Sequence, residues 1–237
     1  MIAIEKAHID CAELSQDGTY GKFIIEPLER GFGNTLGNAL RRVLLSSLPG
    51  VAVTTIKIEG IQHEFSTVPG VTEDVSEIIL NLKALSAKLY SDQMKTVTID
   101  VKGPCEVKAK DIVVDDELEF VDPEAHIATL NEDAHLQMTL TVDSGRGYVS
   151  ADKGKSDDMP IGVIAVDAIY SPVERVNMVV QNTRVGQVTD FDKLTLDVYT
   201  NGTLDPDEAV SLAAKVLSAH LGLVIDLSEN AKSAEVM

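Results

Sequence analysis

The chain has 237 residues, of which 44% are hydrophobic and 24% are charged, and it contains no tryptophan. This composition is typical of a folded globular protein whose core is built from aliphatic side chains. The formal net charge of −18 repels phosphate groups, so broad binding to nucleic acid or to an anionic membrane is not expected.

The cysteines and the first residues indicate an intracellular protein. Cys11 and Cys105 lie far apart and form no CxxC motif, so we expect two unpaired thiols, although the sequence alone does not exclude a disulfide. The segment 1–6, MIAIEK, already contains charged residues and has no signal-peptide core. No apolar run approaches the roughly 18–20 residues of a membrane span. We therefore expect a cytoplasmic protein without a membrane partner.

Five segments in which apolar and polar residues alternate are predicted to form strands. They are 22–26, 53–59, 96–101, 136–142 and 194–199. The predicted helices are few and do not alternate regularly with these strands. The expected fold class is therefore α+β rather than a doubly wound sheet.

Three segments are predicted to form helices. The first runs from about Thr35 to Leu48 and stops at the following Pro-Gly pair. The second begins after Thr72 and places apolar residues at helical spacing as far as Leu85. The third begins at Asp205, which precedes a proline in the first turn and can cap the helix, and it continues through His220.

The remaining segments are expected to be irregular. Residues 111–135 hold nine acids and no lysine or arginine, which predicts a solvated face or loop. Residues 143–160 are glycine-rich and polar and are predicted to form a long mobile loop, and the residues after Leu227 look like the beginning of a linker.

Fragments that imitate ligand or catalytic motifs fail on spacing. In the segment 31–37, GFGNTLG, the third glycine comes one residue later than in a dinucleotide fingerprint. Residues 154–156, GKS, lack the first glycine of a phosphate-binding loop, and the pair 63–64, HE, lacks the second histidine of a zinc protease. We expect no catalytic residue, no cofactor and no metal. A small-molecule enzyme that uses 31–37, or a DNA-binding module, remains as an alternative.

The first predicted helix has two distinct faces. At about 100° per residue, one continuous small and aliphatic stripe forms. Its members are Leu36, Ala39, Leu40, Val43, Leu44 and Ser47. An ordinary buried core face accounts for most of this pattern. Leu45 projects on the opposite side with Arg41 and Arg42 on its flanks, which is a plausible anchor for a protein partner.

The charge distribution around this helix supports a docking role. No acidic residue occurs from Arg30 to Ile58, although the whole protein is strongly acidic. Such a window suits a negatively charged protein surface and is too small to hold DNA against the surrounding field.

Several blocks, which follow one another in order along the whole chain, resemble the bacterial RNA polymerase alpha subunit family. The longest is EPLERGFGNTLGNALRRVLLSS at 26–47. The others are HEFST at 63–67, GRGY at 145–148, YSPVER at 170–175, DKL at 192–194 and TNGT at 200–203.

The resemblance implies a fold with two lobes. A discontinuous dimerisation lobe, made of an antiparallel sheet with two helices, is expected at 1–51 and 172–237. An inserted, mostly β lobe with one helix is expected at 52–171. The implied homodimer interface comprises Phe32, Leu36, Ala39, Leu40, Val43, Leu44, Leu212, Val216, Leu217 and His220.

The resemblance also implies partners and a non-catalytic role in transcription. The chain is expected to nucleate assembly of the polymerase, a nucleotidyltransferase whose active site lies on other subunits. The implied beta-subunit contacts are Arg41, Arg42, Leu45, His63, Glu64, Phe65, Ser66, Thr67 and Gly70, and the implied beta-prime contact is Lys83. Family members continue into a C-terminal domain that binds promoter DNA. No counterpart precedes Met237, so this chain is not expected to bind DNA directly.

Overall fold

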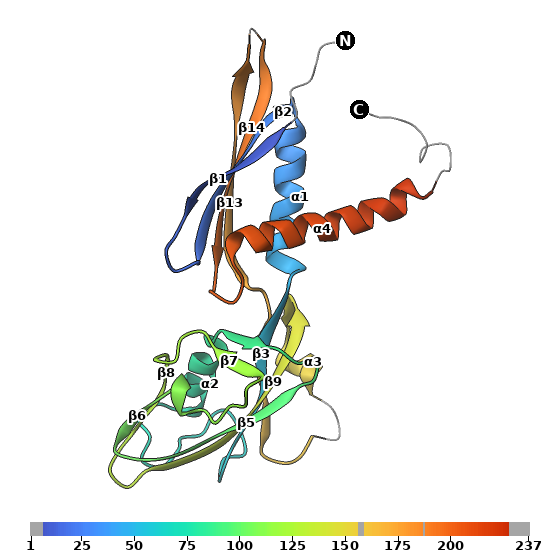
Figure 1. Cartoon of the computed structure of the whole chain (residues 1–237). Helices are drawn as coiled ribbons and strands as arrows, with labels where there is room; N and C mark the ends of the chain where they lie inside the picture. Colours follow the sequence, from blue (N-terminus) through green and yellow to red (C-terminus); the bar gives the residue numbers. More distant parts are fainter. Residues whose placement is uncertain (1–6, 156–158, 187, 228–237) are drawn as a thin grey trace. The chain divides into compact units, whose positions relative to one another are not determined.

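The structure is a computed structural model that describes residues 7–155, 159–186 and 188–227. The chain folds into two compact units, one formed by 1–48 with 172–237 and the other by 49–171 (Figure 1). Both combine antiparallel strands with few helices, so the predicted α+β class is confirmed.

The first unit contains a four-stranded antiparallel sheet in the order β1-β2-β14-β13. Its strands are β1 (His8–Leu14), β2 (Tyr20–Glu29), β13 (Val173–Val185) and β14 (Val188–Thr200). Because side chains alternate across a strand, Phe23 and its register partner Leu196 both face the core, where they are buried. The predicted strands 22–26 and 194–199 are confirmed and lie side by side.

Two helices cover the inner face of this sheet. They are α1 (Phe32–Ser46) and α4 (Pro206–Ile225). The first half of α4 contacts α1 and the sheet, and the helix crosses α1 and extends past it (Figure 1). Buried residues of the sheet, of α1 and of α4 form one hydrophobic core in this unit. The predicted helix 35–48 corresponds to α1, which begins earlier and ends at Ser46, and Pro49 begins the next strand.

The second unit is built on a second antiparallel sheet in the order β11-β3-β9-β5. Its strands are β3 (Pro49–Ile58), β5 (Lys95–Lys102), β9 (His135–Arg146) and β11 (Val163–Ala165). The helix α2 (Val75–Lys83) buries Val75, Ile78 and Leu82, as its apolar spacing predicts. Asp74 caps α2 and forms a capping box with Glu77.

Shorter elements complete the second unit. They are β4 (Ala87–Leu89), β6 (Cys105–Lys108), the 3-10 turn η1 (Ala109–Asp111), β7 (Leu118–Phe120), β8 (His126–Leu130), β10 (Tyr148–Val149), α3 (Ala151–Gly154) and β12 (Ala168–Ile169). The antiparallel pairs β4 with β7, β6 with β8, and β10 with β12 extend the fold beyond the main sheet.

Two predicted irregular segments are ordered in the structure. The acidic stretch 111–135 is not merely a solvated loop, because it contains β7 and β8 and buries residues such as Phe120 and Ile127. The predicted loop 143–160 begins inside β9 and includes β10 and α3, while residues 156–158 lie outside the described residues. The predicted linker after Leu227 also lies outside them.

Candidate functional site

The first residues of helix α1 are hydrogen-bonded to a side chain of a strand that lies far away in the sequence. Gly31 occupies the cap position with a φ of 89°, which glycine adopts without strain, and no local side chain caps the helix. The Asp192 carboxylate of β14 instead accepts hydrogen bonds from the N–H groups of Gly31, at 2.9 Å, and Gly33, at 3.1 Å. This buried carboxylate satisfies donors that a helix leaves unpaired and sets where α1 lies on the sheet.

Two glycines let α1 approach the sheet closely. A Cβ atom on Gly33 would lie 2.8 Å from Val180 Cγ1, and one on Gly37 would lie 2.9 Å from Leu194 Cδ1. Leu40 and Leu44 are also buried, in the core that the helix shares with the sheet. Both belong to the predicted homodimer interface, and within the single chain the sheet and the other helix of the unit cover them.

The rest of the aliphatic stripe remains accessible. Leu36, Ala39 and Val43 are half-buried, and Phe32 at the start of α1 is exposed. The available face of α1 is therefore narrower than the sequence suggested and lies beside the buried glycines.

The opposite side of α1 carries the two arginines. Arg41 and Arg42 are both exposed, and among the described residues no carboxylate forms an ion pair with either. Leu45 was predicted to project into solvent between them, but it is half-buried against the core of the unit. Of these three predicted docking residues, the two arginines are therefore exposed and Leu45 is partly covered.

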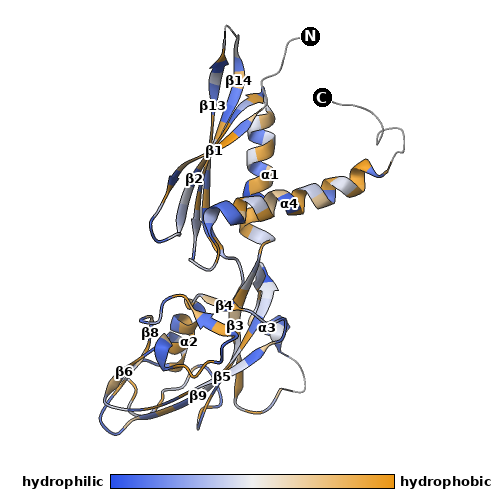
Figure 2. Ribbon diagram, in the orientation of Figure 1, coloured by the Kyte–Doolittle hydropathy of each residue, from blue (hydrophilic) through white to orange (hydrophobic). Residues whose placement is uncertain are grey.

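Helix α4 is packed at its beginning and exposed at its end. Ala209, Val210 and Ala213 are buried, and the predicted interface residues Leu212, Val216 and Leu217 are half-buried. His220 is exposed, and its Nδ1 lies 2.9 Å from the Val216 carbonyl oxygen. Beyond it the apolar side chains are 54–88% exposed, and Figure 2 shows this end of α4 in the hydrophobic colour. They are Leu221, Leu223, Val224, Ile225 and Leu227.

These five residues were not among the predicted interface positions. Their signal was present in the sequence LGLVIDL at 221–227, which is apolar on all sides of a helix rather than on one stripe. By length and composition α4 could also cross a membrane, so the expectation that no segment approaches such a span was wrong. Among the described residues, only 17% of the apolar window in this helix is buried.

The 63–70 loop in the second unit presents most of the predicted beta-subunit contacts. Ile61, just before the loop, and Val68 within it are buried, while Phe65 between them is 82% exposed. The Val75 N–H donates to the Ser66 carbonyl oxygen at 3.1 Å, which ties the loop to the start of α2. A large aromatic side chain is thus held in solvent by a well-anchored loop.

The other loop residues surround Phe65. His63, Glu64, Thr67 and Gly70 are exposed, and Ser66 is half-buried with its Oγ 3.0 Å from His63 Nδ1. The structure therefore brings this group of predicted contacts together on one loop.

Lys83, the predicted beta-prime contact, is paired within its own unit. Its Nζ lies 3.0 Å from Asp167 Oδ2, and its side chain is only 21% exposed. The hydrogen bond from the Ala151 N–H and the bond to Lys83 both lower the pKa of Asp167. Lys83 is therefore not a freely solvated charge on its helix.

The segment 31–37 offers no room for a nucleotide. The Asp192 carboxylate occupies the helix start, where it would repel a phosphate, and the sheet fills the space beside Gly33 and Gly37. Among the residues that the structure describes, no three histidine, cysteine or acidic side chains are grouped to hold a metal ion.

Comparisons with known proteins define the class. A family model described as the RNA polymerase Rpb3/RpoA insert domain matches residues 56–171, which lie within the second unit. The whole chain is 59% identical to the DNA-directed RNA polymerase subunit alpha of Clostridium kluyveri and 57% identical to that of Clostridium beijerinckii. It covers 75% of the length of each relative. The chain belongs to the family of bacterial DNA-directed RNA polymerase alpha subunits.

Proposed function

We propose that the chain is a non-catalytic scaffold subunit of DNA-directed RNA polymerase, acting in the cytoplasm. In this proposal it pairs with a second copy of itself and then docks the beta and beta-prime subunits, which carry the active site. The exposed apolar end of α4 is the observation that carries the proposal, because a scaffold needs uncovered surface and here five large apolar side chains are exposed within seven residues.

A second copy is the occupant that fits this end of α4. Full burial of a leucine side chain contributes about 1.5–3 kcal/mol, so several such residues can hold a dimer together. The exposed Phe32 and the half-buried Leu36 of α1 belong to the same unit and offer a further apolar surface for pairing. A membrane suits the helix less well, because insertion would desolvate Asp207, Glu208 and Lys215.

Docking of the beta subunit is assigned to the arginine pair and to the 63–70 loop. Arg41 and Arg42 have no acidic neighbour in the segment 30–58, so they are free to meet carboxylates of a partner. Phe65 offers an aromatic anchor, and aromatic and arginine side chains dominate interface energetics. Docking of beta-prime is assigned to the surface around Lys83, whose ion pair with Asp167 would orient it.

Capture of purified beta subunit by the tagged chain tests the docking proposal. Arg42→Ala should leave the protein folded and weaken capture by about tenfold or more, since hot-spot truncations cost ~2 kcal/mol. Arg184→Ala removes another exposed arginine in the first unit and should not change capture. Equal capture by the wild type and Arg42→Ala would refute the assignment.

A further inference from the structure

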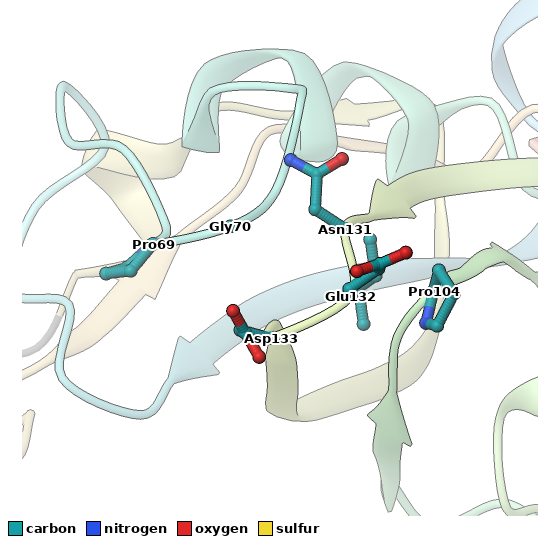
Figure 3. Close-up of a pocket in the computed structure, with 7 residues that line it drawn as sticks. Pro69, Gly70, Pro104, Asn131, Glu132 and Asp133 are labelled. Atoms are coloured by element: carbon teal, nitrogen blue, oxygen red, sulfur yellow. The ribbon is translucent and has the colours of Figure 1, made fainter.

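A pocket in the second unit adjoins the 63–70 loop. Its volume is about 550 Å³, and its walls come from three turns (Figure 3). Pro69 and Gly70 supply the first wall, Pro104 the second, and residues 130–133 the third. Gly70 is thus both the last residue of the 63–70 loop and part of the pocket wall.

Backbone hydrogen bonds hold the three turns together. The Asn131 N–H donates to the Gly70 carbonyl oxygen at 2.9 Å, and the Gly103 N–H donates to the Ala134 carbonyl oxygen at 2.9 Å. Gly70 has a φ of 77°, and a Cβ atom there would lie 2.8 Å from Ala134 Cβ. The pocket is therefore preformed, because its walls are fixed by main-chain contacts rather than by mobile side chains.

The residues that line the pocket include both apolar and acidic side chains. Pro69, Pro104 and Leu130 provide apolar surface, and the Glu132 and Asp133 side chains lie on the turn opposite Pro69 and Gly70 (Figure 3). Among the described residues neither of these exposed carboxylates has an ion-pair partner.

Two basic groups lie close to the pocket in the sequence. Lys102 precedes Pro104 by two residues, and His135, which follows the acidic turn, already binds Asp100 at 2.6 Å. Because His135 is already paired, Lys102 supplies one positive charge near the two negative charges of Glu132 and Asp133. The pocket therefore keeps an excess of negative charge.

We propose that this pocket receives an arginine or lysine side chain of the beta subunit as that subunit docks on the 63–70 loop. The proposal rests on the docking function given above. Long basic side chains bury an aliphatic stem while their charged head stays at a polar edge. Here the two prolines and Leu130 accept the stem, and the carboxylates of Glu132 and Asp133 accept the head.

In this proposal the beta subunit contacts two surfaces of the chain that carry opposite electric charge. Arg41 and Arg42 in the first unit require an acidic region on the partner, whereas the pocket requires a basic one. Paired patches of opposite charge contribute specificity and fix the orientation of a partner more than they add affinity. The beta subunit must therefore present both signs of charge to this chain.

The test measures the affinity of purified beta subunit for the chain with its pocket charge altered. Glu132→Arg with Asp133→Arg should weaken binding by about tenfold or more, and Glu132→Gln with Asp133→Asn by about threefold. Both sites are exposed turn positions, so circular dichroism should remain that of the wild type. Asp92→Arg with Asp116→Arg makes the same change of charge at exposed positions elsewhere in the unit and is the control.

The outcomes separate the pocket from the docking function. Loss of affinity in the pocket variants but not in the control supports the proposal. Unchanged affinity in the pocket variants, with Arg42→Ala still impaired, would overturn the pocket and leave the docking function intact. If the wild-type chain failed to bind the beta subunit, both proposals would fall.

Discussion

The carboxylate of Asp192 accepts a 2.9 Å hydrogen bond from the backbone N–H of Gly31, although 161 positions separate the two residues. This bond joins β14, late in the chain, to the start of α1. The helix that carries Arg41 and Arg42 is therefore positioned by the strand that completes the discontinuous unit, so the arginine pair depends on both ends of the chain.

Replacement of Asp192 should destabilise the first unit. Asp192→Ala removes the acceptor for the N–H groups of Gly31 and Gly33 and should lower the free energy of unfolding by about 1–2 kcal/mol. Asp190→Ala, two residues earlier, removes only an exposed ion pair with Arg30 and should cost less than about 0.5 kcal/mol. Chemical denaturation of both variants checks this, and equal losses would contradict the capping role.

The two helical glycines Gly37 and Gly222 should respond oppositely to alanine. At Gly37 the new methyl group would meet Leu194 and Met178 at 2.9 Å, so Gly37→Ala should cost about 1–3 kcal/mol. A Cβ atom at Gly222 would meet no described atom within 4 Å beyond the adjacent residues and the helix's own backbone, so helix propensity should add up to about 1 kcal/mol of stability. Thermal unfolding of the two variants and of the wild type measures these changes in stability. A stabilised Gly37→Ala protein would show that α1 does not approach the sheet this closely.

Glu73 should make stability depend on pH in the acid range. Burial raises its pKa, but hydrogen bonds from the Thr129 N–H, from His126 and from the Thr129 hydroxyl outweigh this, and the net pKa is lowered from 4.5. Since the folded pKa is depressed, the stabilisation is present above pH 4.5 and is lost as the pH falls through the folded value.

The comparison of the wild type with Glu73→Gln isolates this effect. The difference in unfolding free energy between the two proteins should be larger at pH 5.5 and should shrink toward pH 3. Urea titrations across that range measure it. A difference that stayed constant with pH would mean that the charge of Glu73 contributes nothing.

Periodicity predicted elements better than it predicted which face is buried. The strand at 53–59 and the helix carrying Val75 and Leu82 were found because their apolar residues recur at regular spacing. On α1 the aliphatic stripe did not include Gly33 and Gly37, where the sheet comes closest, because glycine has no side chain to mark a buried face. Small residues reveal close packing only when the neighbouring strand is known.

Other structural elements have sequences that do not clearly predict them. Strand β1 is exposed along its whole length and alternates irregularly, so its sequence did not predict a strand. The acids of 111–135 obscured β7 and β8, whose few core residues, such as Leu118 and Phe120, lie between exposed charges. The pocket lined by 69–70, 104 and 130–133 could not be predicted, because it exists only where three separate turns meet.

The mass of the chain in detergent-free buffer tests the scaffold account most directly, with Leu221→Glu and Leu80→Glu as a matched pair. Both leucines are similarly exposed, at 59% and 61%, but Leu221 lies at the apolar end of α4 and Leu80 lies on α2 of the second unit. Light scattering at micromolar concentration should give twice the 25.5 kDa chain mass for the wild type and for Leu80→Glu. Leu221→Glu should be a folded monomer, because pairing would bury its charge. A wild-type monomer, or a Leu221→Glu protein that remained a dimer, would contradict pairing through α4.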